Sequence, residues 1–349
     1  MIKSNMMGWD IGGAHLKAAV VAHSGEVIAV FQQPCPLWKG LDQLQVAASH
    51  ILHDASAWEC RHALTMTGEL VDLFDDRDDG VKQIIATMTK LLPQKQCLVF
   101  AGLTGFIEAK QVQSQHYQAI ASANWLASAT YAAQKLGNGL FVDIGSTTTD
   151  ILVLKDGQVL AQGYTDYQRL ISRELVYTGI VRTAVMAVAQ IANDQDHEIG
   201  LMAEYFATMA DVYRVTGELN EVHDQSETAD GAEKTIAASA RRLSRMIGSD
   251  FFPDELPRWR EFAENIRGQQ LQKIQSACLV HIQNQAILKV NPIIGAGVGR
   301  FLVKQVAQLL DYPYHDFSDL FPAPASQTGL TTADCAPAVA VAYLAKEFY

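Results

Sequence analysis

Two segments of the chain carry residue types that could hold a polyphosphate and a metal ion. Each is an apolar run followed by Asp-Ile-Gly, a short loop of small or hydroxylic residues, and a second apolar run; the aspartates are Asp10 and Asp143. This order predicts two β-hairpins, each with a carboxylate beside a turn that exposes backbone N–H groups. Mg²⁺ keeps part of its water shell and takes few protein carboxylates, so Asp10 and Asp143 are the candidate metal ligands and catalytic residues. We expect the two hairpins to face each other across a cleft and to hold the polyphosphate from both sides.

Three glycine-containing loops supply the candidate phosphate or nucleotide ligands. Glycine permits positive φ and close approach of the backbone to an anion, and hydroxyl side chains add donors. Lys17 could face the phosphates or be a solvated strand lysine, the threonines could simply begin a strand, and the third loop could be a packing turn. That third loop leads from a strand into a helix, whose N-terminus favours an anion. The candidates are Gly12, Gly13 and Lys17 in the first loop, Gly145, Ser146, Thr147 and Thr148 in the second, and Gly295, Gly297 and Gly299 in the third.

The elements that must position these loops alternate between strand and helix, which predicts α/β layers. In the first part of the chain we expect strands ending at residue 9 and over 16–22, 27–31, 63–67 and 98–101, and helices over 46–52, 81–92 and 119–136. In the second part we expect strands over 140–143, 286–290 and 292–294, and helices over 174–191, 301–310 and 335–346. Helical periodicity dominates 192–277, which predicts an all-helical cap. The expected lobes are therefore 1–139 and 140–349, the second containing the cap.

Length and composition limit the class of protein. A chain of 349 residues exceeds the usual size of a single core, so two lobes are expected. The net charge of −11, with no basic block beyond Arg241, Arg242 and Arg245, argues against a nucleic-acid partner. The five cysteines are scattered without a C-x-x-C pair, which is typical of a reducing cytoplasm. No apolar run approaches the ~20 residues of a membrane helix, and we expect no membrane partner. The oligomeric state stays open, a homo-oligomer included.

The two Asp-x-Gly hairpins followed by Gly-x-Gly resemble the actin-like ATPase superfamily, which includes sugar kinases, heat-shock ATPases and hydantoinase/oxoprolinase proteins. The resemblance implies a two-lobed α/β fold of the ribonuclease H-like kind with a helical insertion in the second lobe. It also implies that the hairpins are phosphate loops and that the later glycines lie on the nucleoside side.

Shorter stretches resemble a hydantoinase-related branch linked to tetrahydromethanopterin-dependent one-carbon transfer; they lie at 65–72, 123–125, 174–179 with 182–183, 204–208 with 210–213, 228–231 and 242–246. The archaeal members of this branch serve methanofuran biosynthesis. They join an aminomethylfuran-methyl diphosphate to the phenol oxygen of γ-glutamyltyramine and release diphosphate. The resemblance implies a transferase with Mg²⁺ as cofactor and small-molecule substrates.

Several polar residues are candidates for contact with such substrates. Glu69 and Asp72 could take the phenol proton, or could be surface charges after a turn. Arg182, on an otherwise apolar stretch, needs an anion or a carbonyl as partner. The further substrate candidates are Asn124, Asp211 and Asp230, of which the two aspartates could instead be helix caps. Trp125 is expected in the core rather than against a ligand.

A second class of function uses the same residues. In an ATP-dependent small-molecule kinase or a hydantoinase-like ATPase, Asp10 and Asp143 would serve Mg²⁺ bound to ATP or another nucleotide. A non-catalytic regulator is a third class, which the lack of a basic helix-turn-helix segment before the first strand disfavours.

Overall fold

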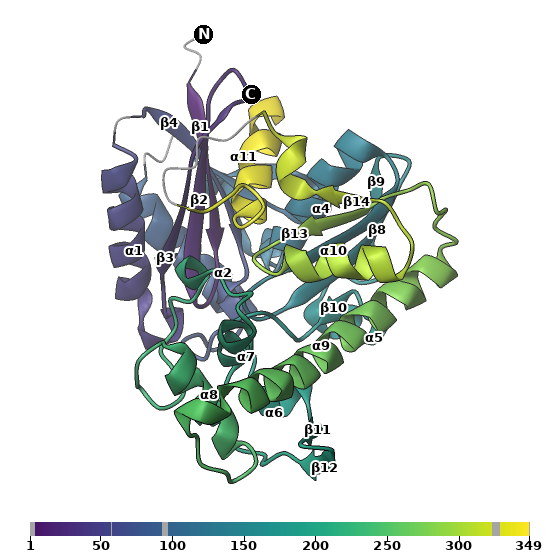
Figure 1. Cartoon of the computed structure of the whole chain (residues 1–349). Helices are drawn as coiled ribbons and strands as arrows, with labels where there is room; N and C mark the ends of the chain where they lie inside the picture. The colour runs from purple at the N-terminus through teal and green to yellow at the C-terminus, as the bar shows by residue number, and fades with distance from the viewer. Residues whose placement is uncertain (1–3, 57, 93–96, 323–328, 349) are drawn as a thin grey trace. The chain divides into compact units, whose positions relative to one another are not determined.

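A computed structural model describes residues 4–56, 58–92, 97–322 and 329–348. The chain divides into two compact units (Figure 1). Unit 1 comprises Met1–Phe141, Leu152–Arg169 and His315–Tyr349, and unit 2 comprises Val142–Ile151 and Leu170–Tyr314. The C-terminal segment, which the sequence assigned to the second lobe, therefore belongs to unit 1.

Unit 1 contains a mixed six-stranded sheet in the order β3-β2-β1-β4-β5-β6. β1 pairs antiparallel with β2 and parallel with β4, so the first predicted hairpin is confirmed. The strands are β1 (Asn5–Ile11), β2 (His15–Val21), β3 (Val27–Pro34), β4 (Cys60–Met66), β5 (Cys97–Phe100) and β6 (Phe106–Glu108).

Helices cover both faces of this sheet, with α1 on one side and α11 on the other (Figure 1). Alternate residues of β1, such as Met7 and Trp9, share a buried core with α1 (Leu41–Asp54) and α2 (Arg77–Leu91). On the other face, α11 (Ala336–Phe348) packs on β1 and on α4 (Asn124–Leu136). A Cβ on Gly8 would lie 2.0 Å from the carbonyl oxygen of Ala338. This close approach explains why glycine faces an alanine-rich helix there. By the alternation of the strand, Asp10 belongs to the same face as Gly8.

A second sheet has the order β10-β8-β7-β13-β14, with β9 paired to β8. Its strands are β7 (Gly139–Ile144), β8 (Thr149–Lys155), β9 (Gln158–Leu160), β10 (Leu175–Val176), β13 (Ile293–Ala296) and β14 (Tyr314–Asp316). β7 and β8 are neighbours joined by the second predicted turn, and α10 (Arg300–Leu309) follows β13. The remaining short helices are α3 (Ser114–Ile120), α5 (Asp166–Ser172) and α6 (Val185–Val188), with 3₁₀ turns at Leu37–Lys39, Gly68–Leu70, Gly102–Thr104, Ala109–Gln111, Glu221–His223, Pro253–Glu255 and Phe317–Leu320.

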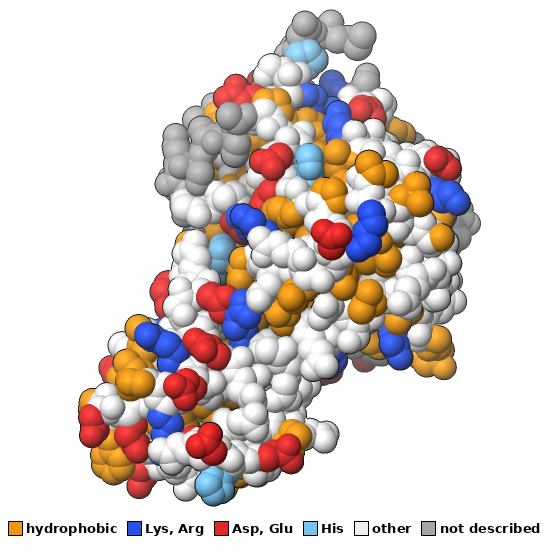
Figure 2. Space-filling view, turned by 45° about the vertical axis from the view of Figure 1, so that its right-hand side comes forward, with side chains coloured by type: hydrophobic (Ala, Val, Ile, Leu, Met, Phe, Trp, Pro, Cys, Tyr) orange, Lys and Arg blue, Asp and Glu red, His pale blue; other side chains and the backbone are white. Residues whose placement is uncertain are grey.

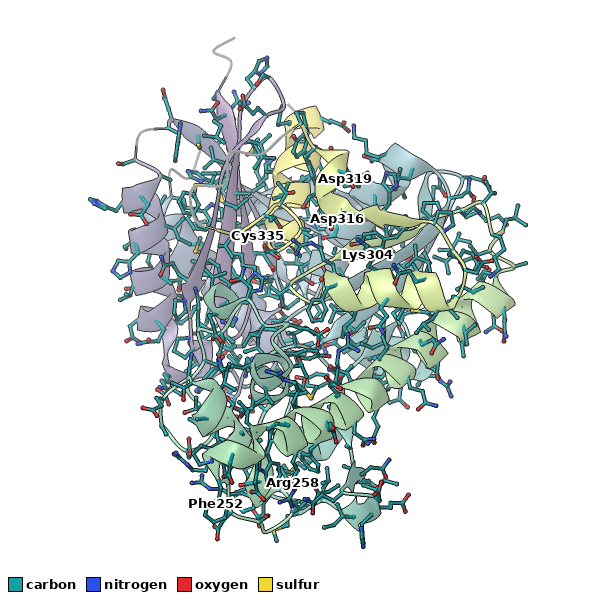
Figure 3. All side chains as sticks on the ribbon, in the orientation of Figure 1. Phe252, Arg258, Lys304, Asp316, Asp319 and Cys335 are labelled. Atoms are coloured by element: carbon teal, nitrogen blue, oxygen red, sulfur yellow. The ribbon has the colours of Figure 1, made fainter. Side chains whose placement is uncertain are left out.

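The predicted helical cap is built around three helices. In unit 2, α7 (Met209–Thr216), α8 (Ile236–Arg245) and α9 (Leu256–Asn284) pack on one another. The cap also contains a hairpin, β11 (Ile191–Asp194) and β12 (His197–Gly200), so the all-helical prediction was wrong there. Its two turn residues adopt positive φ without glycine, which hides the turn in the sequence. Arg258, at the start of α9 (Figure 3), donates two hydrogen bonds of 2.8 Å to Asp194 and ties the hairpin to the helix.

Three further predictions failed for identifiable reasons. The helix expected over 174–191 is mostly irregular, because the N–H groups of Ile180, Val181 and Arg182, in its middle, bond to the second hairpin turn. The strand expected over 286–290 is absent, and Ala286 has a φ of 50°. The helix expected over 119–136 is interrupted after α3, where Ser122 also has a φ of 50°.

Among the described residues, no helix is both long and apolar enough to cross a bilayer. Acidic and basic side chains are interspersed on the face drawn in Figure 2.

Candidate functional site

The two predicted hairpin turns have the same backbone geometry. In unit 1 the N–H of Gly12 donates to the carbonyl oxygen of His15 at 3.0 Å, and in unit 2 the N–H of Gly145 donates to that of Thr148 at 2.8 Å. In each case the turn glycine follows the aspartate by two residues. The repeat seen in the sequence is therefore a repeat of structure.

Both turns use their carbonyl groups within the protein and leave N–H groups available. Gly13 and Ala14 accept hydrogen bonds from backbone N–H groups of the segment after β3, and Ser146 accepts from Val181 and Arg182 at 3.0 and 2.9 Å. Within the described ranges, no backbone bond is donated by the N–H groups of Gly13, Ala14, Ser146 or Thr147. Successive N–H groups in a turn can bind an anion, and phosphate binding by these two turns stays a prediction.

Asp10 is buried at the start of the first turn and meets one of the predicted substrate residues. The Nδ2 of Asn124, the first residue of α4, donates to Oδ1 of Asp10 at 3.2 Å. Lys17 lies opposite Asp10 in the β1–β2 register. Its ammonium donates to the carbonyl oxygen of Asp334 at 2.6 Å, which anchors the segment before α11.

Space around the first turn favours glycine. A Cβ on Gly12 would lie 3.0 Å from the carbonyl oxygen of His15, and one on Gly13 would lie 2.8 Å from Cγ1 of Val71. Side chains at these two positions would press on the turn and on the chain that follows β4.

The two predicted proton acceptors lie in different environments. Glu69, in the 3₁₀ turn after β4, is completely buried, whereas Asp72 is exposed. The Oγ of Ser122 donates to Oε1 of Glu69 at 2.7 Å, and no hydrogen bond reaches Oε2 from the described residues. Burial raises the pKa of Glu69 above that of an ordinary glutamate. A buried carboxyl with a raised pKa is typical of a proton acceptor, and that role for Glu69 stays a prediction.

An ion pair lies beside the hydrogen bond between Ser122 and Glu69. Arg77, at the start of α2, donates to Oδ2 of Asp166 at 2.8 Å, and the same oxygen lies 3.4 Å from Oγ of Ser122. Sequence reasoning missed Ser122, Arg77 and Asp166. Each comes from a different element, so no local spacing relates them to Glu69.

In unit 2, the segment after β10 covers the second turn. The N–H of Ile180 donates to Gly145 at 3.1 Å, and a guanidinium nitrogen of Arg182 lies 3.4 Å from Oγ1 of Thr147. Arg182 therefore meets the predicted phosphate turn, although from an irregular segment and not from the expected helix.

The third glycine loop packs against the end of β7. Gly297 has a φ of 78°, and a Cβ there would lie 2.2 Å from Oδ1 of Asp143. The N–H of Gly299 donates to the carbonyl oxygen of Ile144 at 2.8 Å, and a Cβ on Gly295 would collide with the ring of Tyr314. Packing accounts for all three glycines, and contact of this loop with a nucleotide stays a prediction.

Asp10 and Asp143 are suited to Mg²⁺, which needs few protein ligands, rather than to a metal that needs several side chains. The described residues contain no cluster of three or more His, Cys, Asp or Glu that could hold a metal. Mg²⁺ is commonly held by one or two carboxylates together with water and substrate phosphates. A buried carboxylate beside a turn with undonated N–H groups fits this pattern in each unit. That the two aspartates act on one metal ion stays a prediction.

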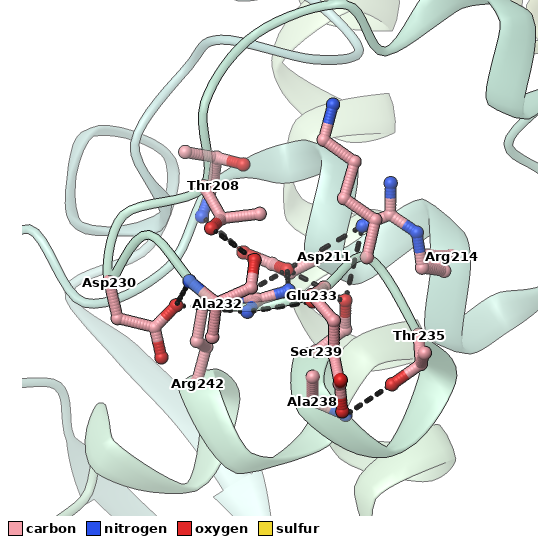
Figure 4. A network of polar contacts seen from close by, with 12 residues as sticks. Thr208, Asp211, Arg214, Asp230, Ala232, Glu233, Thr235, Ala238, Ser239 and Arg242 are labelled. Atoms are coloured by element: carbon pink, nitrogen blue, oxygen red, sulfur yellow. Dashed lines mark hydrogen bonds and ion pairs between the residues drawn. The ribbon is translucent and has the colours of Figure 1, made fainter.

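Asp211 and Asp230 belong to an ion-pair network of the helical region (Figure 4). Asp211 caps α7 by accepting from the N–H of Thr208 at 3.0 Å, and it also accepts from Arg242 at 2.8 Å. Arg242 is fully buried and donates to Asp230 at 3.0 Å. The capping alternative holds for Asp211, whereas Asp230 caps no described helix and pairs with Arg242 and Arg245. A substrate contact for either aspartate stays a prediction.

Comparison with known proteins relates the chain to a family of enzymes. A family model described as hydantoinase/oxoprolinase matches residues 61–338. A protein of Methanocaldococcus jannaschii is 32% identical over 251 residues, covering 71% of this chain and 73% of that protein. It is named as the synthase of a furan-2-yl methanamine that carries a γ-glutamylaminoethyl-phenoxymethyl group. A protein of the same name from Methanococcus vannielii is 34% identical over 113 residues, covering 32% of this chain and 50% of that protein.

Among solved structures, a nucleotide-free acetone carboxylase resembles the chain with a TM-score of 0.64 at 10% identity. The likeness covers 98% of this chain and 70% of that one. At this identity it bears on the fold alone, and it confirms the predicted α/β class.

Proposed function

The chain belongs to the hydantoinase/oxoprolinase family, as its motifs predicted, and we propose that it is a diphosphate-releasing transferase of methanofuran biosynthesis. In this proposal it joins a furfuryl-type diphosphate to the phenol oxygen of a tyramine- or tyrosine-glutamate acceptor. It thereby supports tetrahydromethanopterin-linked one-carbon metabolism in the cytoplasm. The observation that carries the proposal is the 32% identity, over 71% of the chain, to a synthase whose named product contains a phenoxymethyl link to a furan.

The chemistry of that link suits the groups in the two turns. The phenol oxygen attacks the methylene carbon beside the furan ring, and the diphosphate leaves with the electron pair of the broken C–O bond. Negative charge grows on the leaving group, so donors already aimed at it lower the barrier. The undonated N–H groups of the turns, together with Lys17 and Arg182, are the donors that we assign to it.

Mg²⁺, when bound, would neutralise charge on the departing diphosphate, and Asp10 and Asp143 are the carboxylates that we assign to hold it. Asn124 positions the carboxylate of Asp10 through its hydrogen bond. Glu69 takes the proton, because burial raises its pKa toward that of the phenol it must deprotonate.

An ATP-dependent reaction at the same turns is the second candidate. It rests on the two turns themselves, because their undonated N–H groups suit any polyphosphate. In that case the undonated N–H groups would bind the phosphates of a nucleotide.

Product analysis separates the two candidates. The protein is incubated with Mg²⁺ plus the furan diphosphate and γ-glutamyltyramine, and separately with Mg²⁺, ATP and the same acceptor. We expect ether and diphosphate in equal amounts in the first reaction without any nucleotide. Formation of ADP in the second reaction, with no diphosphate in the first, would refute the proposal and favour the ATPase.

Variants test the assigned residues in the same assay. Asp10→Asn or Asp143→Asn should lower diphosphate release by about 10²-fold or more, by analogy with the loss of one charge-stabilising group. The exposed Asp75→Asn is the matched control and should keep the wild-type rate. Equal rates for all three variants would remove both aspartates from the mechanism.

A further inference from the structure

A cavity of about 210 Å³ lies in unit 1 next to the Glu69–Ser122 pair. It is formed by the 3₁₀ turn Gly102–Thr104, the chain from the end of α3 to the start of α4, and Tyr164. Ser122 and Trp125 are only 3% exposed and form its inner wall, whereas Leu103 and Tyr164 are 72% and 47% exposed and form its rim. An apolar cavity of ~150 Å³ accommodates benzene, so this one has room for a ring with a short substituent.

The lining of the cavity is aromatic. The ring centroids of Trp125 and Tyr164 are 6.3 Å apart, and the guanidinium carbon of Arg169 lies 4.0 Å from the centroid of the Trp125 ring. The indole N–H of Trp125 has no hydrogen-bond partner in the described part of the chain. A buried indole N–H usually finds an acceptor. The sequence placed Trp125 in the core; it is buried, but against a cavity.

The polar end of the cavity is Ser122. Its φ of 50° is unusual for a residue other than glycine, and such backbone is retained where the surroundings demand it. Ser122 lines the cavity, and its hydroxyl donates to Glu69, whose Oε2 accepts no hydrogen bond from the described residues. Two residues later, Asn124 bonds Asp10. One short segment thus joins the cavity, the buried carboxylate and the aspartate of the first turn.

Resting on the proposed function, we propose that this cavity is the acceptor site, where a phenol ring lies against Trp125 and Tyr164 with its hydroxyl on Ser122. As the phenol oxygen bonds to the methylene carbon, the bond from that carbon to diphosphate breaks and diphosphate takes the electron pair. The phenol proton moves to Oγ of Ser122, whose own proton moves to Oε1 of Glu69. Arg77 and Asp166 are the charged groups that face Glu69, and burial raises its pKa, which suits it to accept the proton.

Binding of tyramine to the full chain, measured by calorimetry without any diphosphate substrate, tests the site itself. Tyr164→Ala should weaken binding about fivefold, the range of one aromatic contact. Tyr167→Ala is the matched control, since Tyr167 is 75% exposed and outside the cavity lining. Phenethylamine, which lacks the hydroxyl, should bind about tenfold more weakly than tyramine. Equal affinities for both variants, or for both amines, would overturn the proposal.

Turnover tests the proton path. Ser122→Gly removes the hydroxyl and tolerates the positive φ, so its fold is preserved. We expect a loss in kcat of about tenfold or more, and a pH–rate profile without the limb that Glu69→Gln also removes. Ether formation by Ser122→Gly and Tyr164→Ala with wild-type constants would refute the cavity while leaving the proposed function intact. Tyramine binding with the expected variant pattern, but no diphosphate release from any furan diphosphate, would refute the function instead.

Discussion

Gly297→Ala tests whether the third glycine loop positions the aspartate of the second turn. A Cβ at this position would lie 2.2 Å from Oδ1 of Asp143 and 2.3 Å from the carbonyl oxygen of Ile144. One of these atoms is backbone at the end of β7, so alanine fits only if α10 or the end of β7 shifts. The residue also has a φ of 78°, which alanine rarely adopts.

The cost can be worked from these two effects. The positive φ contributes about 1–2 kcal/mol, and overpacking contributes about 1–3 kcal/mol. We therefore expect the free energy of unfolding to fall by about 2–5 kcal/mol, and diphosphate release to fall with it because the carboxylate of Asp143 is displaced.

Two control variants isolate the contributions: Gly217→Ala measures the cost of positive φ alone, and Gly145→Ala measures ligand approach without a change in stability. Gly217 has a φ of 82° but no atom within 4 Å of its Cβ position, so alanine there should lower the free energy of unfolding by about 1–2 kcal/mol, through the positive φ alone. Gly145 has its nearest neighbour at 3.5 Å, an ordinary contact, so its alanine variant should keep its stability. Any loss of activity in Gly145→Ala would then report on ligand approach to the turn.

Urea unfolding of the three variants, with midpoints compared at unchanged slope, gives the stabilities, and diphosphate release gives the activities. If Gly297→Ala is no less stable than Gly217→Ala and as active as the wild type, the contact between Gly297 and Asp143 has no role and the reasoning fails.

Three further perturbations have expected outcomes. Burial lowers the pKa of His62 to about 4. Because the unfolded histidine binds a proton below pH 6.5 and the folded one does not, the free energy of unfolding should drop by about 3 kcal/mol between pH 6.5 and 4. Urea midpoints of the His62→Gln variant should lack this drop. Burial raises the pKa of Glu69. As the pH rises, the unfolded carboxyl loses its proton before the folded one, so the free energy of unfolding falls above the ordinary pKa of a glutamate. Glu69→Gln should therefore be more stable than the wild type at pH 8 but not at pH 4, and it should lose activity. Asp211→Asn removes the buried carboxylate that pairs with Arg242 and Arg214, and leaves Arg242 only the more exposed carboxylate of Asp230; it should destabilise unit 2 by about 3–5 kcal/mol. The control Asp230→Asn should cost less because its side chain is 22% exposed, and a stable Asp211→Asn with a raised KM would instead favour the substrate role.

The sequence by itself predicted the twin turns, most strands and helices of unit 1, and the family. These depend on local patterns: alternating apolar residues specify a strand, and an aspartate two residues before a turn glycine keeps that spacing in any fold that forms the hairpin. The family could also be predicted, because the motifs that resemble it are short local stretches of the sequence.

Tertiary structure decided what local patterns leave open. Asp72 and Glu69 are three residues apart and alike in chemistry, but only Glu69 is buried, because burial depends on the elements that pack over the turn. The segment 174–191 has helical periodicity, but its N–H groups bond to the second turn, and hydrogen bonds to a distant partner outweighed its helix propensity. Ser122, Trp125 and Tyr164 line one cavity although Tyr164 is about forty residues from the others along the chain. These three residues meet because the elements that carry them pack together, and no local sequence pattern records which elements do so.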